Sequence, residues 1–318
     1  MEAEAKKIVF NVKPHSAKVY LNSYMKVRVL MELKDKRKPL HKKPLDEILK
    51  VLDTVPNPNT RNAYLNVVKK IFMSEKNKKV LDEKDKEIRV LRQNHKKEKF
   101  GLLNKSELPT YTELSNLIKN EKNPKKYFVN FLFLKVNVRN QDIAYVKLHK
   151  SVEDESELEK DLNHIYIKGN KAVYIRNKYK TASTHGQKRN LISVKKFVGV
   201  VKELLGEEES KLLFSKSNGE PITNGSISSY FRPFLYMLGN GKDGLLAEGE
   251  IMKIVMKYIN EEGTFGDLRR VSNNRGTAEA TLLNEYDITN IKQPTENITQ
   301  DKKPTINITP ADQIKAPE

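Results

Sequence analysis

The spacing of apolar residues changes at about Pro109, and this change constrains the possible folds more than any other feature. Before Pro109, apolar residues recur three or four positions apart, which is the spacing of helices that bury one face. One such set comprises Tyr20, Tyr24, Val27 and Met31. After Pro109, helical stretches are mixed with stretches of alternating apolar and polar residues, which are typical of strands. The chain is therefore expected to form two units, one helical and one mixed.

The helical unit is predicted over residues 14–99 as a small, basic bundle. Prolines and capping residues precede several of its apolar stripes, and lysines occupy the other faces. Its helices are expected at 14–31, 44–54, 58–72 and 74–99. Residues 1–13 are interpreted as an N-terminal extension, and residues 100–108 as the linker to the second unit.

The mixed unit is predicted over residues 109–291. Its clearest signal is a β-hairpin at 164–177, in which two alternating runs flank a turn with Gly169 and Asn170 at its centre. A further strand is expected at 189–194. Helices are expected at 109–120, 124–138, 194–206, 226–238 and 248–260. The fold class is thus mainly α with a small antiparallel sheet (α+β).

After residue 291 the sequence is rich in Pro, Thr, Asn and Lys and has no apolar periodicity. Such a composition cannot bury enough apolar surface to offset the entropy of ordering the backbone. Residues 292–318 are therefore predicted to be a disordered tail.

The chain carries 59 Lys and Arg against 41 Asp and Glu, a formal net charge of +18. This excess favours a polyanionic partner, most simply nucleic acid, whose phosphates release small counterions when basic side chains replace them. A lysine-rich composition inherited from an AT-rich genome is the alternative explanation.

Composition also limits the chemistry that the chain can perform. There is no cysteine, which excludes disulfides, thiolate metal sites and thiol nucleophiles. The six histidines are scattered, so no metal and no other cofactor is expected. No apolar run approaches the ~20 residues of a membrane span, and residues 1–9 are too charged for a signal peptide. An intracellular protein without a membrane segment is expected.

Three residues could carry chemistry, and each also has an ordinary structural explanation. Arg139 directly follows an apolar helix and could present its guanidinium to a phosphate, or it could pair with Asp142. Lys180 stands at the end of a strand and could donate a proton, or it could be a solvated turn lysine. Tyr286 is the last tyrosine of the chain and could be a nucleophile, or it could be an aromatic residue packed beneath a helix.

The order of an arginine, a hairpin lysine and a C-terminal tyrosine, after a basic helical unit, resembles the tyrosine recombinases, the family of phage-type integrases. The likeness covers residues 14–290. The stretches that carry it are SAKVYLNSYMKV and NTRNAYLNVVKKIF in the helical unit, then NVRNQDIAYVKL, YKTASTHGQKRNLISV and RGTAEATLLNEY in the mixed unit.

The resemblance implies a DNA strand exchange that needs no metal or nucleotide. Tyr286 would attack a DNA phosphodiester and form a 3′-phosphotyrosyl link, Arg139 would stabilise the charge on phosphorus, and Lys180 would protonate the leaving 5′-oxygen. The partner would be double-stranded DNA, held in a C-shaped clamp between the two units. Lys18 and Arg61 are candidates for contacts with its backbone.

The resemblance also bears on assembly and origin. Family members usually assemble as tetramers on two duplexes, so a homotetramer on DNA is implied. A virus or a mobile element is the expected origin. The protein would then act in the cytoplasm or nucleus of a host cell, or be carried in a virion.

The chain departs from the family pattern at two positions. The family's second arginine, in a His-x-Leu-Arg motif about 34 residues before the tyrosine, falls on Met252, which cannot donate a hydrogen bond. Arg269, in a similar local pattern, lies only 17 residues before Tyr286, so residues 265–276 are interpreted as the helix and loop that precede the tyrosine segment. The family's late His or Trp falls on Thr277.

These departures leave three functions open. The first is a recombinase or integrase, either active or with impaired catalysis. The second is a DNA-binding structural or regulatory protein that keeps the recombinase architecture without the chemistry. The third is an RNA-binding or virion scaffold protein in which the order of the motifs is coincidental.

Overall fold

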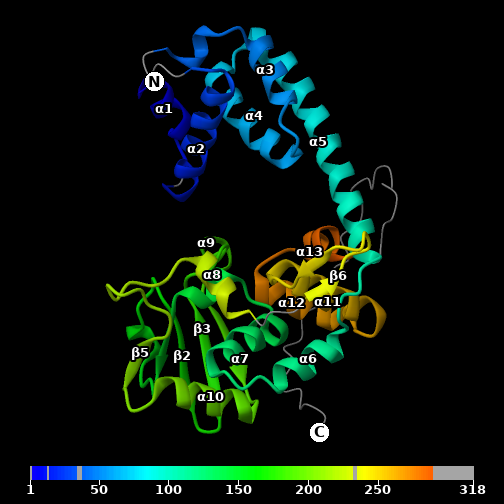
Figure 1. Ribbon diagram of the computed structural model, residues 1–318. Helices are drawn as coiled ribbons and strands as arrows, with labels where there is room; N and C mark the ends of the chain where they lie inside the picture. Colours follow the sequence, from blue (N-terminus) through cyan, green and yellow to red (C-terminus); the bar gives the residue numbers. More distant parts are fainter. Residues whose placement is uncertain (1, 13, 34–37, 232–234, 289–318) are drawn as a thin grey trace, which may run out of the picture.

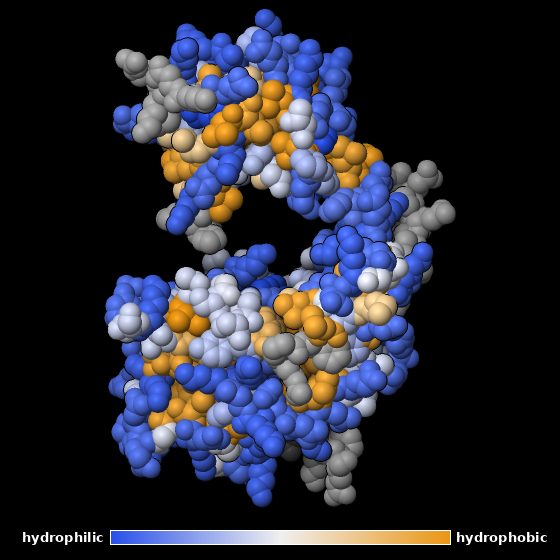
Figure 2. All heavy atoms as spheres, in the orientation of Figure 1, coloured by the Kyte–Doolittle hydropathy of each residue, from blue (hydrophilic) through white to orange (hydrophobic). Residues whose placement is uncertain are grey.

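A computed structural model describes residues 2–12, 14–33, 38–231 and 235–288, so the tail predicted at 292–318 lies outside the described residues. The chain forms two lobes joined along one side by the long helix α5 (Glu75–Asn104), as Figure 1 shows. Figure 2 shows an opening between the lobes on the other side of that helix. The molecule is therefore C-shaped. Among the described residues, no helix combines the length and the apolar character needed to cross a bilayer.

The first lobe consists of helices packed around one apolar core. Its helices are α1 (Glu2–Val9), α2 (Pro14–Leu30), α3 (Leu45–Asp53), α4 (Pro58–Phe72) and most of α5, with a short 3-10 turn at Leu40–Lys42. The start of α4 follows directly from its sequence, because Asn57 accepts hydrogen bonds from the backbone N–H groups of Asn59 and Thr60. Tyr24, Val27, Ile48 and Leu65 are among the buried core residues.

Helix α1 is part of this lobe and lies within residues 1–13, the segment interpreted from sequence as an extension. Ile8 is fully buried in the core. The carboxylate of Glu4 accepts hydrogen bonds from the hydroxyl of Tyr24 at 2.5 Å and from the backbone N–H of Leu40 at 3.1 Å. Burial, reinforced by this carboxylate, raises the pKa of Tyr24 to about 12. The buried carboxylate of Glu4 thereby connects α1 with α2 and with the 3-10 turn that begins at Leu40.

The second lobe contains a five-stranded sheet in the order β4-β3-β2-β1-β5. The strands are β1 (Val146–His149), β2 (Asn163–Lys168), β3 (Lys171–Arg176), β4 (Lys188–Ile192) and β5 (Ser210–Leu212). The predicted hairpin is confirmed: Lys168 pairs with Lys171, and Gly169 adopts a φ of 62°, which glycine tolerates without strain. The other pairings are antiparallel except that of β1 with β2, which is parallel.

Helices surround this sheet and complete the core of the lobe. They are α6 (Tyr111–Lys119), α7 (Pro124–Phe131), α8 (Asn140–Ala144), α9 (Ala182–His185), α10 (Lys195–Leu205), α11 (Glu248–Glu261), α12 (Phe265–Arg275) and α13 (Glu279–Tyr286). The rings of Phe128 and Phe197 stack 5.4 Å apart, which packs α7 against α10. The mainly α fold class with a small sheet is confirmed, and the parallel pair makes that sheet mixed.

The helix predicted at 226–238 is wrong. A 3-10 turn spans Asn224–Tyr230, and a short strand β6 (Leu235–Met237) then pairs with β7 (Asp243–Leu245). The apolar spacing misled the prediction because the sequence holds a proline at position 233, and a proline inside a helix lacks the N–H that the helix needs and would clash with the preceding turn. Gly241 then adopts a φ of 76° in the turn between the two strands.

The end of α5 is attached to the second lobe. Helix α5 continues to Asn104, within the segment interpreted as a linker. Leu103 packs in a small apolar cluster with Tyr236 and Ile288, and the backbone N–H of Glu107 donates to the carbonyl of Met237 at 2.8 Å. One continuous helix therefore spans from the first core to the second lobe, close to the C-terminal end of α13.

Candidate functional site

Arg139, Lys180 and Tyr286, the three residues singled out from the sequence, line a single cavity of about 500 Å³. They come from three distant parts of the chain: the start of α8, the turn after β3, and the last residue of α13. The rest of the lining comprises Thr181, Gly276, Thr277, Ala278, Thr281 and Glu285. The structure thus brings together a guanidinium, an ammonium and a phenol.

Arg139 also holds the loop that leads to α13. Its Nη1 donates to the carbonyl of Arg275, and its Nη2 donates to the hydroxyl oxygen of Thr277. A guanidinium has five N–H donors, so these two bonds leave others for a ligand. Burial and then the positive charge of Arg275 lower the pKa of Arg139 from its ordinary value. Thr277, which the resemblance places at the late His or Trp of the tyrosine recombinases, accepts a hydrogen bond from the arginine.

Gly276 makes the tight loop between α12 and α13 possible. Its φ of 58° ends α12 in the left-handed conformation that favours glycine. A Cβ at this position would collide with the hydroxyl oxygen of Thr181, which itself donates to the carbonyl of Gly276 at 2.9 Å. The loop and the Lys180 turn therefore touch across the cavity wall. The interpretation of residues 265–276 as a helix and loop is confirmed.

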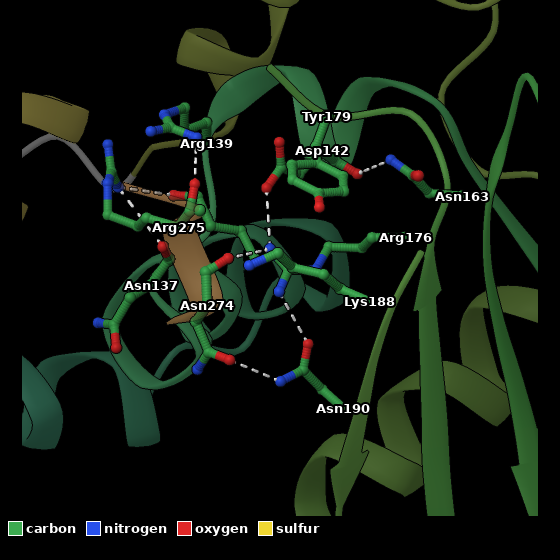
Figure 3. A network of polar contacts seen from close by, with 12 residues as sticks. Asn137, Arg139, Asp142, Asn163, Arg176, Tyr179, Lys188, Asn190, Asn274 and Arg275 are labelled. Carbon is green, nitrogen blue, oxygen red and sulfur yellow. Dashed lines mark hydrogen bonds and ion pairs between the residues drawn. The ribbon is translucent and has the colours of Figure 1, made fainter. Parts of the chain in front are cut away.

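A buried polar network lies behind this loop, as Figure 3 shows. Arg176 and Asp142 are both fully buried and form an ion pair at 3.0 Å. Arg176 also donates to the carbonyl of Asn274 at 2.7 Å and to the side chain of Asn190 at 3.0 Å. Burial raises the pKa of Asp142 from its ordinary value, although the charge of Arg176 opposes this shift. The network fixes β3 and β4 against the end of α12.

The ion pair of Arg139 with Asp142, which was the structural alternative from sequence, is not formed. The backbone N–H of Asp142 donates to the carbonyl of Arg139, while the carboxylate of Asp142 pairs with Arg176. Sequence spacing could not distinguish these partners, because Arg176 approaches only through the sheet.

Two lysines lie near the site in different settings. Lys180 is exposed and lines the cavity. Lys188, the first residue of β4, donates to the carbonyl of Asn273, and its ammonium lies 5.4 Å from the centre of the Tyr179 ring. Burial, followed by the charge of Arg176, lowers the pKa of Lys188. Lys188 therefore lies behind the cavity wall, whereas Lys180 faces the cavity.

Sequence reasoning missed Arg275, the last residue of α12. Its guanidinium is almost completely buried, and its Nη2 lies 3.4 Å from the phenolic oxygen of Tyr286. It belongs to the quoted RGTAEATLLNEY stretch, but only its helical position, 11 residues before the tyrosine, could have drawn attention to it. Met252, at the expected position of the second arginine, is buried in the apolar core instead.

A second cavity, of about 800 Å³, lies between the lobes, and Tyr286 also borders it. Basic residues of α5 line it on the first-lobe side: Arg89, Arg92, His95, Lys96 and Lys99. Lys253 and Glu250 of α11 line the other side, and burial lowers the pKa of Lys253. Lys96 forms an ion pair with Glu285 at 2.8 Å, which links the two lobes beside Tyr286.

The two residues suggested for contacts with the DNA backbone differ in their surroundings. Lys18 is exposed on α2. The guanidinium of Arg61 donates to the carbonyls of Val55 and Asp53, at 2.8 and 3.0 Å, and so closes the turn between α3 and α4. Neither residue lies at the cavity that holds Tyr286, and their contacts with DNA stay predictions.

Comparisons with known proteins give no sequence match and a weak structural likeness to a solved structure. No protein-family model matches the chain, and no curated protein matches its sequence. Among solved structures, it is similar to the crystal structure of XerA recombinase, with 10% sequence identity over 91% of this chain and 94% of that chain. The TM-score is 0.33. A score this low does not establish a shared fold, so the proposal below rests on the geometry of this chain.

Proposed function

We propose that the protein is a tyrosine recombinase that cleaves and rejoins duplex DNA. The observation that supports this most strongly is the shared cavity of Arg139, Lys180 and Tyr286. These side chains are far apart in sequence, and a nucleophile, a phosphate-binding cation and a proton donor are the groups that transfer of a phosphodiester requires.

In the proposed reaction, the phenolic oxygen of Tyr286 forms a bond to the DNA phosphorus while the bond from phosphorus to the 5′-oxygen breaks. The phenolic proton passes to solvent, and Lys180 gives a proton to the leaving 5′-oxygen. The products are a 3′-phosphotyrosyl link and a free 5′-hydroxyl, so a 5′-hydroxyl of another strand can reverse the step. Arg139 donates hydrogen bonds to the phosphate oxygens, where negative charge accumulates.

The opening between the lobes would hold the duplex (Figure 2). The helical unit at 14–99 and the mixed unit at 109–291 would contact opposite faces of the DNA, with the basic side of α5 along the phosphates. Lys18 and Arg61 are retained as candidates for backbone contacts. A tetramer on two duplexes would bring together the strands that exchange.

A DNA duplex with a nick close to the cleavage site tests this proposal, because the short fragment released after attack diffuses away and traps the covalent adduct. A library of duplex sequences is needed, since the target site is unknown. We expect a protein–DNA adduct that resists denaturation and is lost in Tyr286→Phe. Tyr258→Phe is the matched control, because Tyr258 stacks on Tyr111 away from the cavity and its loss should leave the adduct intact.

A binding protein without catalysis is the second candidate, and the burial of Met252 in the core favours it. This protein would form no adduct with any duplex, yet it would bind DNA with an affinity that falls steeply with salt. The logarithm of the binding constant should fall by roughly 0.9 for each phosphate contact per tenfold rise in salt. Tighter binding to RNA than to duplex or branched DNA would instead support an RNA-binding or scaffold protein.

A further inference from the structure

We propose that Arg275 is a catalytic residue that acts on the nucleophile: its guanidinium holds the phenolic oxygen of Tyr286 and stabilises the phenolate during attack. The inference rests on the proposed function. It assigns a role to a residue outside the Arg139, Lys180 and Tyr286 set, and it locates a second guanidinium at the site although position 252 is methionine.

The contact geometry places Arg275 against the phenol. Its Nη2 lies 3.4 Å from the phenolic oxygen, and its guanidinium carbon lies 5.4 Å from the centre of the same ring. Arg275 does not line the cavity that Arg139 and Lys180 share with Tyr286. The side chain therefore approaches the tyrosine from behind, and the phenolic oxygen can face a phosphate while the cation stays beside it.

Other contacts hold the guanidinium in this orientation. Nη1 donates to the carbonyl of Val138 at 3.1 Å, next to Arg139 in the chain. Nη2 pairs with the carboxylate of Glu248 at 2.9 Å. The second carboxylate oxygen of Glu248 accepts the backbone N–H of Asn140 at 3.1 Å, at the start of α8. One carboxylate thus connects the cation beside the nucleophile with the segment that presents Arg139.

The hydrogen bond from Arg275 to the phenolic oxygen of Tyr286 is long, at 3.4 Å. A buried cation beside a phenol stabilises the ionised phenol more than the neutral form, since the attraction is weakly screened there. This is the property that an attacking tyrosine requires when no neighbouring base takes its proton.

A fluorine label on the phenol tests the contact without any DNA. The protein is prepared with 3-fluorotyrosine at position 286 alone, and its fluorine resonance is recorded at neutral pH. Arg275→Met should shift this resonance, because it removes the neighbouring cation. Glu248→Gln should shift it in the opposite direction, because it leaves the cation uncompensated. Opposite shifts are not expected from a role in folding alone.

Other charged groups around the phenol set the background for this experiment. They include Arg139, Lys180 and Glu285 at the first cavity, and Glu250, Lys253 and the basic residues of α5 at the second. All of them remain in both variants, so the two shifts report on Arg275 and its carboxylate. Arg275→Lys keeps the positive charge, so its effect on the phenol should be smaller than that of Arg275→Met. The same fluorine resonance in Arg275→Met, Glu248→Gln and the parent protein would overturn the inference.

Cleavage of two substrates then separates activation of the nucleophile from protonation of the leaving group. One duplex has the normal 5′-oxygen at the scissile bond, and the other has sulfur there, which leaves as a thiolate without a proton. Arg275→Met should slow adduct formation by about 10²–10³ on both substrates. The defect of Lys180→Ala should disappear with sulfur. If sulfur also rescued Arg275→Met, the arginine would serve the leaving group and the inference would be wrong.

The outcomes distinguish the two proposals. Absence of any Tyr286 adduct from the parent protein would refute the proposed function, while the fluorine resonance would still show whether Arg275 acts on the phenol. A Tyr286 adduct that forms at the parent rate in Arg275→Met would refute the inference alone.

Discussion

Two arginine clusters lie on either side of the loop at 274–277, and they differ in how they meet solvent. Arg176 is sealed with Asp142, and its hydrogen bonds to the loop and to Asn190 are internal. Arg139 lies at the edge of a cavity, where some of its donors remain for a ligand. The sealed cluster can only support the fold, whereas the open one can meet a substrate. The comparison shows that two residues of the same type have different roles: Arg176 supports the fold, whereas Arg139 is placed to bind a substrate.

The largest effect on stability is expected at the sealed cluster. Asp142→Asn would leave the buried charge of Arg176 without its counterion, and removing one partner of a buried ion pair costs about 3–5 kcal/mol. Urea unfolding followed by circular dichroism measures this loss. The control is Asp161→Asn on the exposed surface, with an expected change within about 0.5 kcal/mol. A small effect of Asp142→Asn would show that the cluster is not a closed scaffold.

The next effect concerns the open cluster and should appear in rate more than in binding. Arg139→Ala should slow adduct formation by about 10²–10³, equivalent to roughly 3–4 kcal/mol, because a donor aimed at the developing charge is lost. DNA affinity should change much less, since many other cations contact the phosphates. If adduct formation were as fast in Arg139→Ala as in the parent protein, the open cluster would have no catalytic role that sets it apart from the sealed cluster.

Two lysines sharpen the comparison further. Lys180→Ala should slow cleavage at least about a hundredfold if this residue protonates the leaving oxygen. Lys188→Ala should act mainly on stability, because its ammonium donates to the carbonyl of Asn273 behind the cavity. Single-turnover cleavage and urea unfolding of both variants measure the two effects. The reverse pattern would assign the proton donor to Lys188, whose pKa is lowered by burial.

The smallest effect is expected between the lobes. Lys96 and Glu285 form an ion pair with partly exposed side chains, and such pairs contribute about 0.2–1 kcal/mol. A double-mutant cycle with Lys96→Ala and Glu285→Ala, measured at low and at high salt, gives the coupling energy. We expect the coupling to vanish at high salt. A coupling energy well above 1 kcal/mol that persists at high salt would mean that the contact between the lobes is as strong as a buried ion pair such as that of Arg176 with Asp142.

Local structure was predictable where the sequence itself carried the physical cause. The 164–177 hairpin followed from alternation and a glycine-containing turn. The interpretation of residues 265–276 as a helix and loop held because both ends of α12 have local causes, a capping box at Thr264 and the left-handed Gly276. The helix expected at 226–238 failed because apolar spacing alone outweighed Pro233 in the prediction. Parallel pairing of β1 with β2 was also missed, since it depends on how a connection returns to the sheet.

The site could be predicted only in part. Arg139, Lys180 and Tyr286 stood out through their order in the chain, but their common cavity depends on three loops that meet at the end of α12. The ion-pair partner of Asp142 is Arg176, which lies 34 residues away in sequence and is brought close by the sheet. Arg275 carried no signal, because a basic residue in the last turn of a helix is ordinarily explained by the helix dipole.

The sequence by itself determined the positive charge, the absence of cysteine chemistry, the helical first lobe and most of the local turns. Each of these depends on composition or on neighbours within a few residues. Tertiary structure alone decided which arginine pairs with Asp142, which cation touches Tyr286 and which lysine faces the cavity. The physical reason is that burial and contact between distant side chains arise only when the core forms. The sequence alone does not tell whether an arginine at a given position supports the fold or takes part in the reaction.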